Sequence, residues 1–302
     1  MALQKEIWIN DIQEKLFAGA EFVTKSVDHS AFVSNKIVHL PQAGSAPSLV
    51  KNRAAYPATI TQRTDSESTY NLNEYTTDPI LLTDIDELQT SYEKRNSILG
   101  QHIDVLNDRI ALETAFAWST DTAASQIVTT GAASSSALAS SATGTRLELT
   151  KEDVRKAAAL FDRQNVVSTG RVLVLPSDMY YQLFSDTVLI SSDYMNRSSL
   201  EGGVIAQLYG FDIMIRSAVA EFGEAATVYT KNAVGAAGAA TDSLGALAFQ
   251  TNSVSNALGD IKVFANEDKA EYYGSIFSAL VMHGSASMRA DEKGIASIVQ
   301  GV

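Results

Sequence analysis

The feature that most constrains this chain is one long amphipathic segment. From Tyr92 to Trp118, apolar residues recur at the spacing of one helical face, and polar residues fall on the opposite face. The apolar face carries Leu99, Ile103, Leu106 and Ile110. A rise of about 1.5 Å per residue gives a helix of this length a span of roughly 40 Å. The fold therefore has to be organised around a helix that crosses a whole domain.

Several shorter segments carry their own helix or strand signals. Apolar residues at helical spacing predict a short amphipathic helix over Trp8–Phe17. A second helix is expected after Thr150, a candidate capping box with Asp153, and a third over Ser177–Phe184. Strands are predicted over Ala31–Leu40, Arg171–Leu175, Phe211–Arg216, Ala246–Gln250, Ile261–Ala265, Ser275–His283 and Ile295–Val299. This order has no regular βαβ repeat, so the predicted fold class is α+β.

Two regions look unusual for a lone globular domain. Ser119–Thr145 is dominated by Ser, Ala, Thr and Gly, which predicts a mobile connection or surface loop. Tyr56–Arg63 and Ser68–Thr76 are rich in strand formers and flank the polar tetrad Thr64–Glu67, which predicts a long β-hairpin. Neither arm has an apolar face, and an isolated hairpin is marginally stable in water. The hairpin is therefore expected to project and to find support elsewhere.

A small basic cluster lies in and near this hairpin. Lys51, Arg53 and Arg63 stand together in a chain that is otherwise acidic. They form either an ordinary solvated hairpin or an electrostatic contact with an acidic patch on a neighbouring copy, and the sequence favours the two about equally. The candidate inter-subunit contacts are Lys51, Arg53, Arg63, Asp65, Glu67 and Trp8.

Composition excludes several classes of function. The net charge of -12 disfavours wrapping nucleic acid, since the average surface repels phosphate. The absence of cysteine excludes disulfides, thiolate nucleophiles and sulfur-ligated metals. No run approaches the roughly 18 apolar residues of a membrane span, and the start lacks a signal-peptide pattern, so synthesis in the cytoplasm is expected.

No catalytic or metal-binding motif emerges from the remaining polar residues. The four histidines, His29, His39, His102 and His283, have no paired spacing such as H-E-x-x-H, and the glycine patterns of nucleotide-binding loops and esterase elbows are missing. Asp84, Asp86 and Glu87 precede the long helix. Without the EF-hand spacing, these carboxylates are interpreted as complementing the helix dipole and not as a calcium site. No catalytic residue, cofactor or metal is predicted.

Four stretches together resemble one known family. They are the N-terminal NKIVHLP, the hairpin, the helix within SYEKRNSILGQHIDVLNDRIALETAFAW, and the C-terminal YYGSIFSALVMHGSASMRADEKGIASIVQ. The segment LTKEDVRKAAALFDRQNVVSTGRVLVLPSDMYYQLF is similar to the opening of that family's axial domain. The family is the major capsid proteins of tailed bacteriophages, which have the Hong Kong 97 phage capsid fold.

The resemblance implies a domain organisation. It places an N-terminal arm at residues 1–48 and the extended β-hairpin, called the E-loop, at 49–78. It places a peripheral domain with the long spine helix at 79–122 and 251–302. An axial domain then occupies residues 123–250.

The resemblance also implies a function and a set of partners. The chain is expected to self-assemble as pentamers and hexamers into the icosahedral capsid of a virion, inside the cytoplasm of a bacterial host. The shell is expected to enclose double-stranded DNA without sequence-specific binding, with a portal and a separate scaffolding protein as partners and a cement protein as an optional further one. The scaffolding expectation arises because the chain begins at Met1 without a long helical segment to be cleaved. Lys51 lies where some relatives form a covalent cross-link, but no partner residues are identifiable, and no cross-link is predicted.

Two alternatives remain open at this point. The first is the shell subunit of a bacterial encapsulating compartment, which would hold a cargo enzyme. The second is an enzyme with an unrecognised site, which Asp84, Asp86, His102 and Asp104 would have to form by meeting in one pocket.

Overall fold

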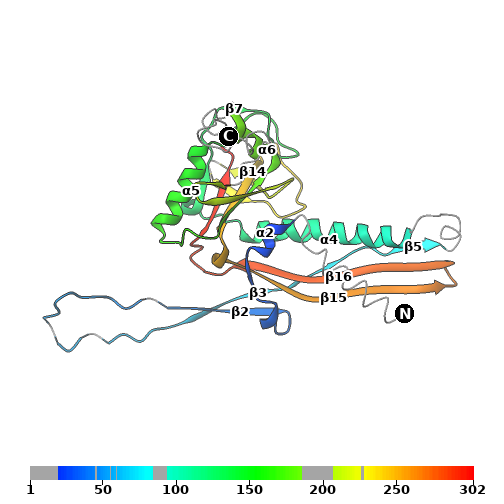
Figure 1. Ribbon diagram of the computed structural model, residues 1–302, viewed down its shortest axis with the longest axis horizontal. Helices are drawn as coiled ribbons and strands as arrows, with labels where there is room; N and C mark the ends of the chain where they lie inside the picture. The colour runs from blue at the N-terminus through cyan, green and yellow to red at the C-terminus, as the bar shows by residue number, and fades with distance from the viewer. Residues whose placement is uncertain are drawn as a thin grey trace.

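Helix α4 (Lys94–Trp118) confirms the central prediction and runs through the middle of the molecule (Figure 1). In the computed structural model, the described residues are 20–44, 46–54, 56–58, 60–83, 94–185, 207–225 and 228–302. The predicted helix over Trp8–Phe17 lies outside them. Ile103 and Ile110 on the apolar face are buried, and Asp104 and Asp108 on the polar face are exposed.

A five-stranded sheet lies along one side of α4. Its long strands β15 (Val254–Lys269) and β16 (Gly274–Ser287) form an antiparallel ladder, and both extend well beyond the predicted strands. Strands β1 (Val27–Asp28), β4 (Asn73–Thr76) and β5 (Ile80–Thr83) complete the sheet. The face towards α4 forms a core with the helix that includes Phe277, Val281 and Leu106.

An eight-stranded sheet forms a second, more compact unit above the long strands (Figure 1). Its strand order is β10-β11-β9-β14-β12-β13, and β17 pairs with both β14 and β6. The bounds are β6 (Gln126–Val128), β9 (Arg171–Pro176), β10 (Gln207–Leu208), β11 (Phe211–Arg216), β12 (Ala220–Ala225), β13 (Val228–Lys231), β14 (Ser243–Gln250) and β17 (Ile295–Val299). A small separate pair consists of β7 (Ala133–Ser134) and β8 (Arg146–Leu147).

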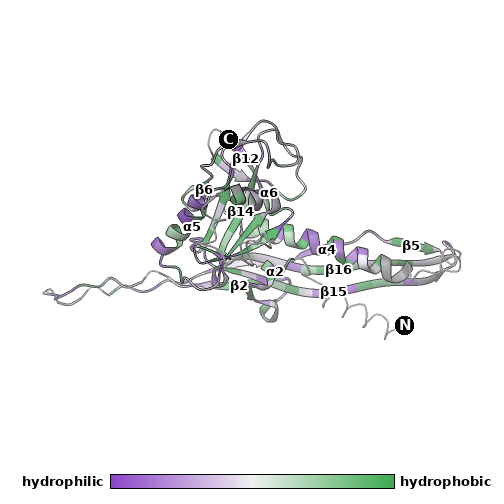
Figure 2. Cartoon of the chain, turned by 45° about the horizontal axis from the view of Figure 1, so that its top comes forward, coloured by the Kyte–Doolittle hydropathy of each residue, from purple (hydrophilic) through white to green (hydrophobic). Residues whose placement is uncertain are grey.

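Both faces of this sheet are covered by helices. Helices α5 (Lys151–Arg163) and α6 (Ser177–Gln182) pack on one face. The short helix α2 (Glu21–Thr24) and the C-terminal end of α4 pack on the other. Every residue of β9 and β14 is buried, as expected for strands covered on both sides. Figure 2 shows hydrophobic residues along the strands around β14, beside α5, which carries many hydrophilic residues.

Trp118 joins the two units. It lies at the end of α4 and packs against Phe22 and Phe249, with ring centroids 5.8 Å and 5.1 Å away. Its indole N–H donates to the carbonyl of Ser255 at the start of β15, with an N···O distance of 3.1 Å. The helix therefore carries one rigid connection between the eight-stranded and the five-stranded sheets.

The predicted pairing of Tyr56–Arg63 with Ser68–Thr76 is wrong, although the segment that follows β2 (Ile37–Gln42) does project. Strand β3 (Ser66–Asn71) pairs with β2, and none of the described residues within 56–63 lies in a strand. The predicted strand Ala31–Leu40 corresponds to β2, which begins only at Ile37 and follows a 3-10 turn at Ser30–Phe32. Residues 43–65 form the long projecting loop between these strands (Figure 1), and the predicted turn Thr64–Glu67 belongs partly to β3.

Two further expectations are corrected by the eight-stranded sheet. Ser119–Thr145 is not a simple connection, because it contributes β6 to the sheet and buries Thr120, Ser125 and Thr129. The C-terminal strand β17 was expected in the unit of the long helix but pairs with β14 and β6. Short strands such as β6 carry too few residues to show a period of two.

Candidate subunit interface

The loop of residues 43–65 exposes large apolar side chains to solvent. Leu49 is 91% exposed, Tyr56 is 80% exposed and Ile60 is 95% exposed. Such side chains gain free energy from burial, and several of them on one projecting segment indicate a surface for another molecule. The loop offers no core of its own, because its described residues are exposed or only half-buried.

The neck of this loop is held by Asp65. Its carboxylate accepts from the backbone N–H of Gly44 at 2.8 Å and from Nε of Arg63 at 2.6 Å. These hydrogen bonds, that of Gly44 first, lower the pKa of Asp65 from its usual value. A side chain at Gly44 would collide with the carbonyl of Thr64. The two legs therefore approach closely here, and Arg63 and Asp65 are engaged with each other.

Lys51 and Arg53 lie further out on the loop. Among the described residues neither has an ion-pair partner, unlike Arg63, and Lys51 is exposed. The outer loop therefore combines apolar side chains with two positive charges in a chain of net charge -12. Such a surface is electrostatically complementary to an acidic protein surface.

The remaining predicted contact residues lie elsewhere. Glu67 pairs with His39 across the β2–β3 ladder, where both side chains are about half exposed. Trp8 lies outside the described residues. The sequence prediction missed the apolar side chains of the loop because Tyr56–Arg63 was interpreted as a strand. Pro57 within this segment, and Pro47 before it, were the signals against a paired strand, since proline is rare inside paired strands.

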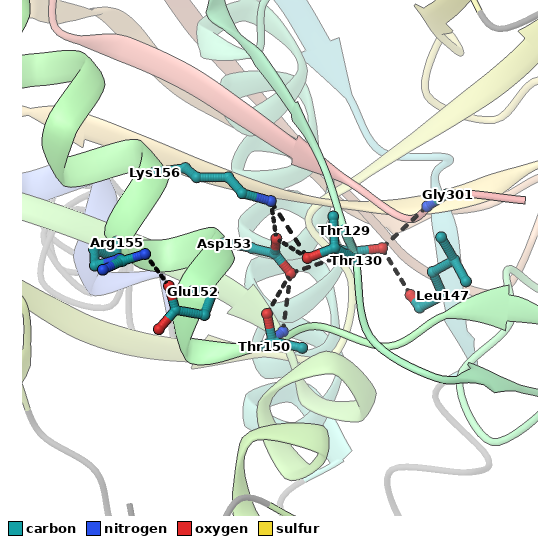
Figure 3. Close-up of polar contacts among 9 residues, drawn as sticks. All are labelled: Thr129, Thr130, Leu147, Thr150, Glu152, Asp153, Arg155, Lys156 and Gly301. Atoms are coloured by element: carbon teal, nitrogen blue, oxygen red, sulfur yellow. Dashed lines mark hydrogen bonds and ion pairs between the residues drawn. The ribbon is translucent and has the colours of Figure 1, made fainter.

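A polar cluster around Asp153 in the eight-stranded unit is structural. Asp153 confirms the predicted capping box by accepting from the backbone N–H of Thr150, and its buried carboxylate also accepts from Thr130 and Lys156 (Figure 3). Burial raises the pKa of Asp153, but the hydrogen bonds from Lys156, Thr130 and Thr150 outweigh burial, and the pKa is lowered overall. These hydrogen bonds hold the first turn of α5 together and join it to Thr130, so the cluster anchors a helix.

A buried arginine fixes the top of the same unit. Arg146 donates five hydrogen bonds, to the carbonyls of residues 143, 145, 240 and 242 and to the hydroxyl of Ser243. It thereby ties together two loops rich in small residues that are distant in sequence. A fully hydrogen-bonded guanidinium has no free donor for a ligand, and this arginine is a structural one.

The enzyme alternative finds no support in the described residues. His102 is buried and Asp104 is exposed on the other side of α4, while Asp84 and Asp86 lie outside the described residues. Within the ranges that the structure describes, no three His, Asp or Glu side chains are placed to hold a metal ion. None of the described helices has the length and apolar character needed to cross a membrane.

The described fold combines a long helix on a long two-stranded ladder, a compact sheet unit and a projecting apolar loop. The comparisons with known proteins identify this combination. The family model described as phage capsid protein matches residues 24–299. A search of the curated proteins gave no match.

Solved structures of capsids share the fold. The capsid of cyanophage P-SCSP1u has a TM-score of 0.65 at 19% identity, covering 91% of this chain and 85% of that one. The cyanophage Pam1 capsid has a TM-score of 0.62 at 11% identity, covering 92% and 89%. The capsid of Ralstonia phage GP4 has a TM-score of 0.59 at 12% identity, covering 92% and 87%.

The chain belongs to the phage capsid protein family, because the family model spans most of its length. It is a structural protein of the virion capsid and not an enzyme. The family match also decides between a phage shell and an encapsulating compartment, in favour of the phage shell.

Proposed function

We propose that this chain is the major subunit of an icosahedral phage shell, assembled as pentamers and hexamers around packaged double-stranded DNA. The projecting loop is the observation that carries the proposal. It exposes Leu49, Tyr56 and Ile60, which no described part of the same chain covers. Burying such side chains against neighbouring copies supplies many modest contacts, and symmetry multiplies them.

The parts of the fold then take the roles that the family resemblance implies. Residues 43–65, with β2 and β3, act as the E-loop, and α4 acts as the spine helix. The five-stranded sheet with α4 is the peripheral domain, and the eight-stranded sheet is the axial domain. This assignment moves β17 from the predicted peripheral segment 251–302 into the axial domain.

The acidic composition supports enclosure of DNA without binding it. A net charge of -12 makes the average surface repel phosphate, so DNA can be packed and released without adhering to the wall. We further propose a separate scaffolding protein and a portal as assembly partners, with a cement protein as an optional third. No covalent cross-link is predicted for the mature shell, so boiled particles should give a single band at the mass of one chain.

Sedimentation of the purified chain, followed by electron microscopy of the heavy fraction, tests the proposal. The chain is expressed alone and together with the neighbouring phage genes. Closed shells, or pentameric and hexameric rings, are the expected result. A chain that stays monomeric even with a candidate scaffolding protein present would overturn the proposal.

A further inference from the structure

A partly enclosed hollow lies where α4 meets the eight-stranded sheet. It is bounded by the helix, by the residues around the start of β12 and by the segment 232–238 that follows β13, and its volume is about 260 Å³. Leu112 and Phe116, one helical turn apart on α4, form an apolar wall together with Val219. All the lining residues belong to one copy of the chain, so binding of a ligand here does not depend on assembly.

The segment that borders the hollow after β13 is fixed at several points. Asp242, which is buried just beyond it, accepts from the backbone N–H of Ala239 at 2.7 Å. Arg109 on α4 donates to the carbonyl of Val234 at 3.0 Å. A side chain at Gly238 would collide with a neighbouring serine. These contacts hold the segment in place, and its alanines and glycines leave the space beside it unfilled.

Glu221 places a carboxylate at the wall of this hollow. It lies in β12, and its neighbour Phe222 is fully buried on the other face of that strand. The carboxylate accepts a hydrogen bond from the backbone of Ser140, which also lines the hollow. Burial, followed by the negative charge of Asp242, raises the pKa of Glu221, and the bond from Ser140 offsets only part of that rise. A cation beside such a carboxylate stabilises its charged form.

The cations on the elements around this carboxylate are engaged elsewhere. Arg109 forms an ion pair with Glu113 at 2.7 Å, in addition to its hydrogen bond to the segment after β13. Nζ of Lys231 donates to two carbonyl oxygens near the end of α4, at 3.1 Å and 2.8 Å. Within the described part of the chain, Glu221 therefore has no counter-ion.

We infer that this hollow binds a small aliphatic amine in its protonated form, a primary alkylammonium ion. The ammonium group pairs with Glu221, and the aliphatic stem lies against Leu112 and Phe116. An ammonium group has three N–H donors. The hydroxyl of Ser140 and the amide oxygen of Asn232, which line the same hollow, offer acceptors for the two donors that do not face the carboxylate.

Other classes of ligand fit the hollow less well. A phosphate or a carboxylate would be repelled by Glu221 and by the nearby Asp242. Within the described ranges, no three His, Asp or Glu side chains meet to hold a metal ion. An uncharged aliphatic molecule would cover the apolar wall but leave the carboxylate without a counter-ion. A lysine side chain of another protein carries the same ammonium group, but its peptide backbone needs room at the mouth of the hollow, whereas a free amine needs none.

Ligand-detected NMR with butylamine at neutral pH tests the site on the whole chain. The wild type should bind butylamine saturably, and it should bind butan-1-ol, which has the same stem and no charge, at least about tenfold more weakly. Glu221→Gln, which keeps the shape of the side chain, should weaken the binding of butylamine by a similar factor. The matched control Glu224→Gln, on the same strand but outside the hollow, should bind it as the wild type does. Nα-acetyl-lysine amide should bind more weakly than butylamine, and the reverse order would overturn the assignment to a free amine.

Leu112→Lys gives a second measurement if Glu221→Gln does not fold. This substitution puts an aliphatic stem and an ammonium group into the hollow from α4, so the variant should no longer bind butylamine. The matched control Leu112→Met, which adds no charge, should still bind it. A wild-type chain that does not bind butylamine saturably would overturn the inference, and so would binding that neither Glu221→Gln nor Leu112→Lys weakens. The proposed shell is tested separately by sedimentation, so the two failures are distinguishable.

Discussion

The eight-stranded unit and the projecting loop differ in how far their apolar side chains are buried within the chain. In the upper unit, β9 and β14 are buried along their whole length, and buried polar groups such as Arg146 and Asp153 are hydrogen-bonded within the unit. In the loop, Leu49 and Ile60 are almost fully exposed. The eight-stranded unit is therefore stabilised by its own contacts, whereas no described part of the same chain covers the apolar side chains of the loop.

A shell subunit built in this way separates stability from assembly. A substitution in the upper unit should lower the stability of the single chain, because it removes contacts that already exist. A substitution in the outer loop should leave the single chain unchanged and weaken the shell. Substitutions along the chain should therefore differ strongly in how far they lower the free energy of unfolding of the monomer.

Phe249→Ala should lower the free energy of unfolding of the monomer most. Phe249 is fully buried in β14 and packs against Trp118. Removing such a ring from a core typically costs about 3–5 kcal/mol in free energy of unfolding, measurable by urea titration of the monomer. The matched control is Phe264→Ala, at a half-exposed phenylalanine, which should cost much less. Equal losses for both variants would contradict the assignment of the core.

His283 should make the stability of the monomer depend on pH. Burial in β16 lowers the pKa of His283 from 6.5 to about 4, so the folded state disfavours the charged form. As pH falls, the unfolded chain takes up the proton first. Stability is therefore complete above about pH 6.5 and is lost by about 3 kcal/mol as pH falls towards 4.

Urea titrations of wild type and His283→Gln between pH 7 and pH 4 measure this effect. The variant should lose a large part of the pH dependence that the wild type shows in this window, and buried His102, whose pKa burial also lowers, should account for a remainder. The control His39→Gln, at a half-exposed histidine in β2, should retain it. A wild-type chain with equal stability at both ends of the window would refute the prediction.

Asp153→Asn should lower the free energy of unfolding by less than Phe249→Ala does. It weakens the reciprocal cap of α5 and removes the charge that pairs with Lys156, and the loss of a helix cap costs about 1–2 kcal/mol. Because the pKa of Asp153 is lowered in the folded state, its contribution is present at neutral pH and is lost as pH falls below its ordinary value near 3.8. The control Glu152→Gln, at a half-exposed neighbour, should change the unfolding free energy far less, and a reversed order would rule out the cap.

Ile60→Ser should hardly change the stability of the monomer. The side chain is 95% exposed, so its removal should change the free energy of unfolding by less than about 0.5 kcal/mol. The same variant should reduce the yield of shells in the sedimentation assay. The control Thr61→Ser, a polar exchange at the next position of the loop, should assemble normally. Normal shells from Ile60→Ser would show that this side chain is not buried on assembly.

The sequence predicted elements with a clear period well. The helix ending at Trp118 and the strand Phe211–Arg216 were placed correctly, because each has enough residues to show its periodicity, and the strand Ile295–Val299 was placed from a short, mostly apolar run. The cap at Thr150 was also found, since a Thr followed by a carboxylate three residues later is a local signal.

Pairing between distant segments could not be predicted in the same way. Strand β2 pairs with β3 across the loop of 43–65, and β17 joins β14 and β6, but nothing in a single sequence records which strands meet. The exposed apolar side chains of the loop were missed for a related reason. Charges such as Lys51 are visible in the sequence, whereas the exposure of Ile60 follows from the absence of a neighbour in space.

Removal of the loop separates its role in assembly from any role in the stability of the subunit. Residues 46–62 are replaced with a short Gly-Ser connection, and this variant is compared with the wild type by sedimentation velocity, electron microscopy and thermal unfolding. We expect a folded monomer with an unchanged unfolding midpoint and no shells, under conditions in which the wild type forms them. Closed shells of wild-type size from the shortened chain would contradict the proposed role of the loop.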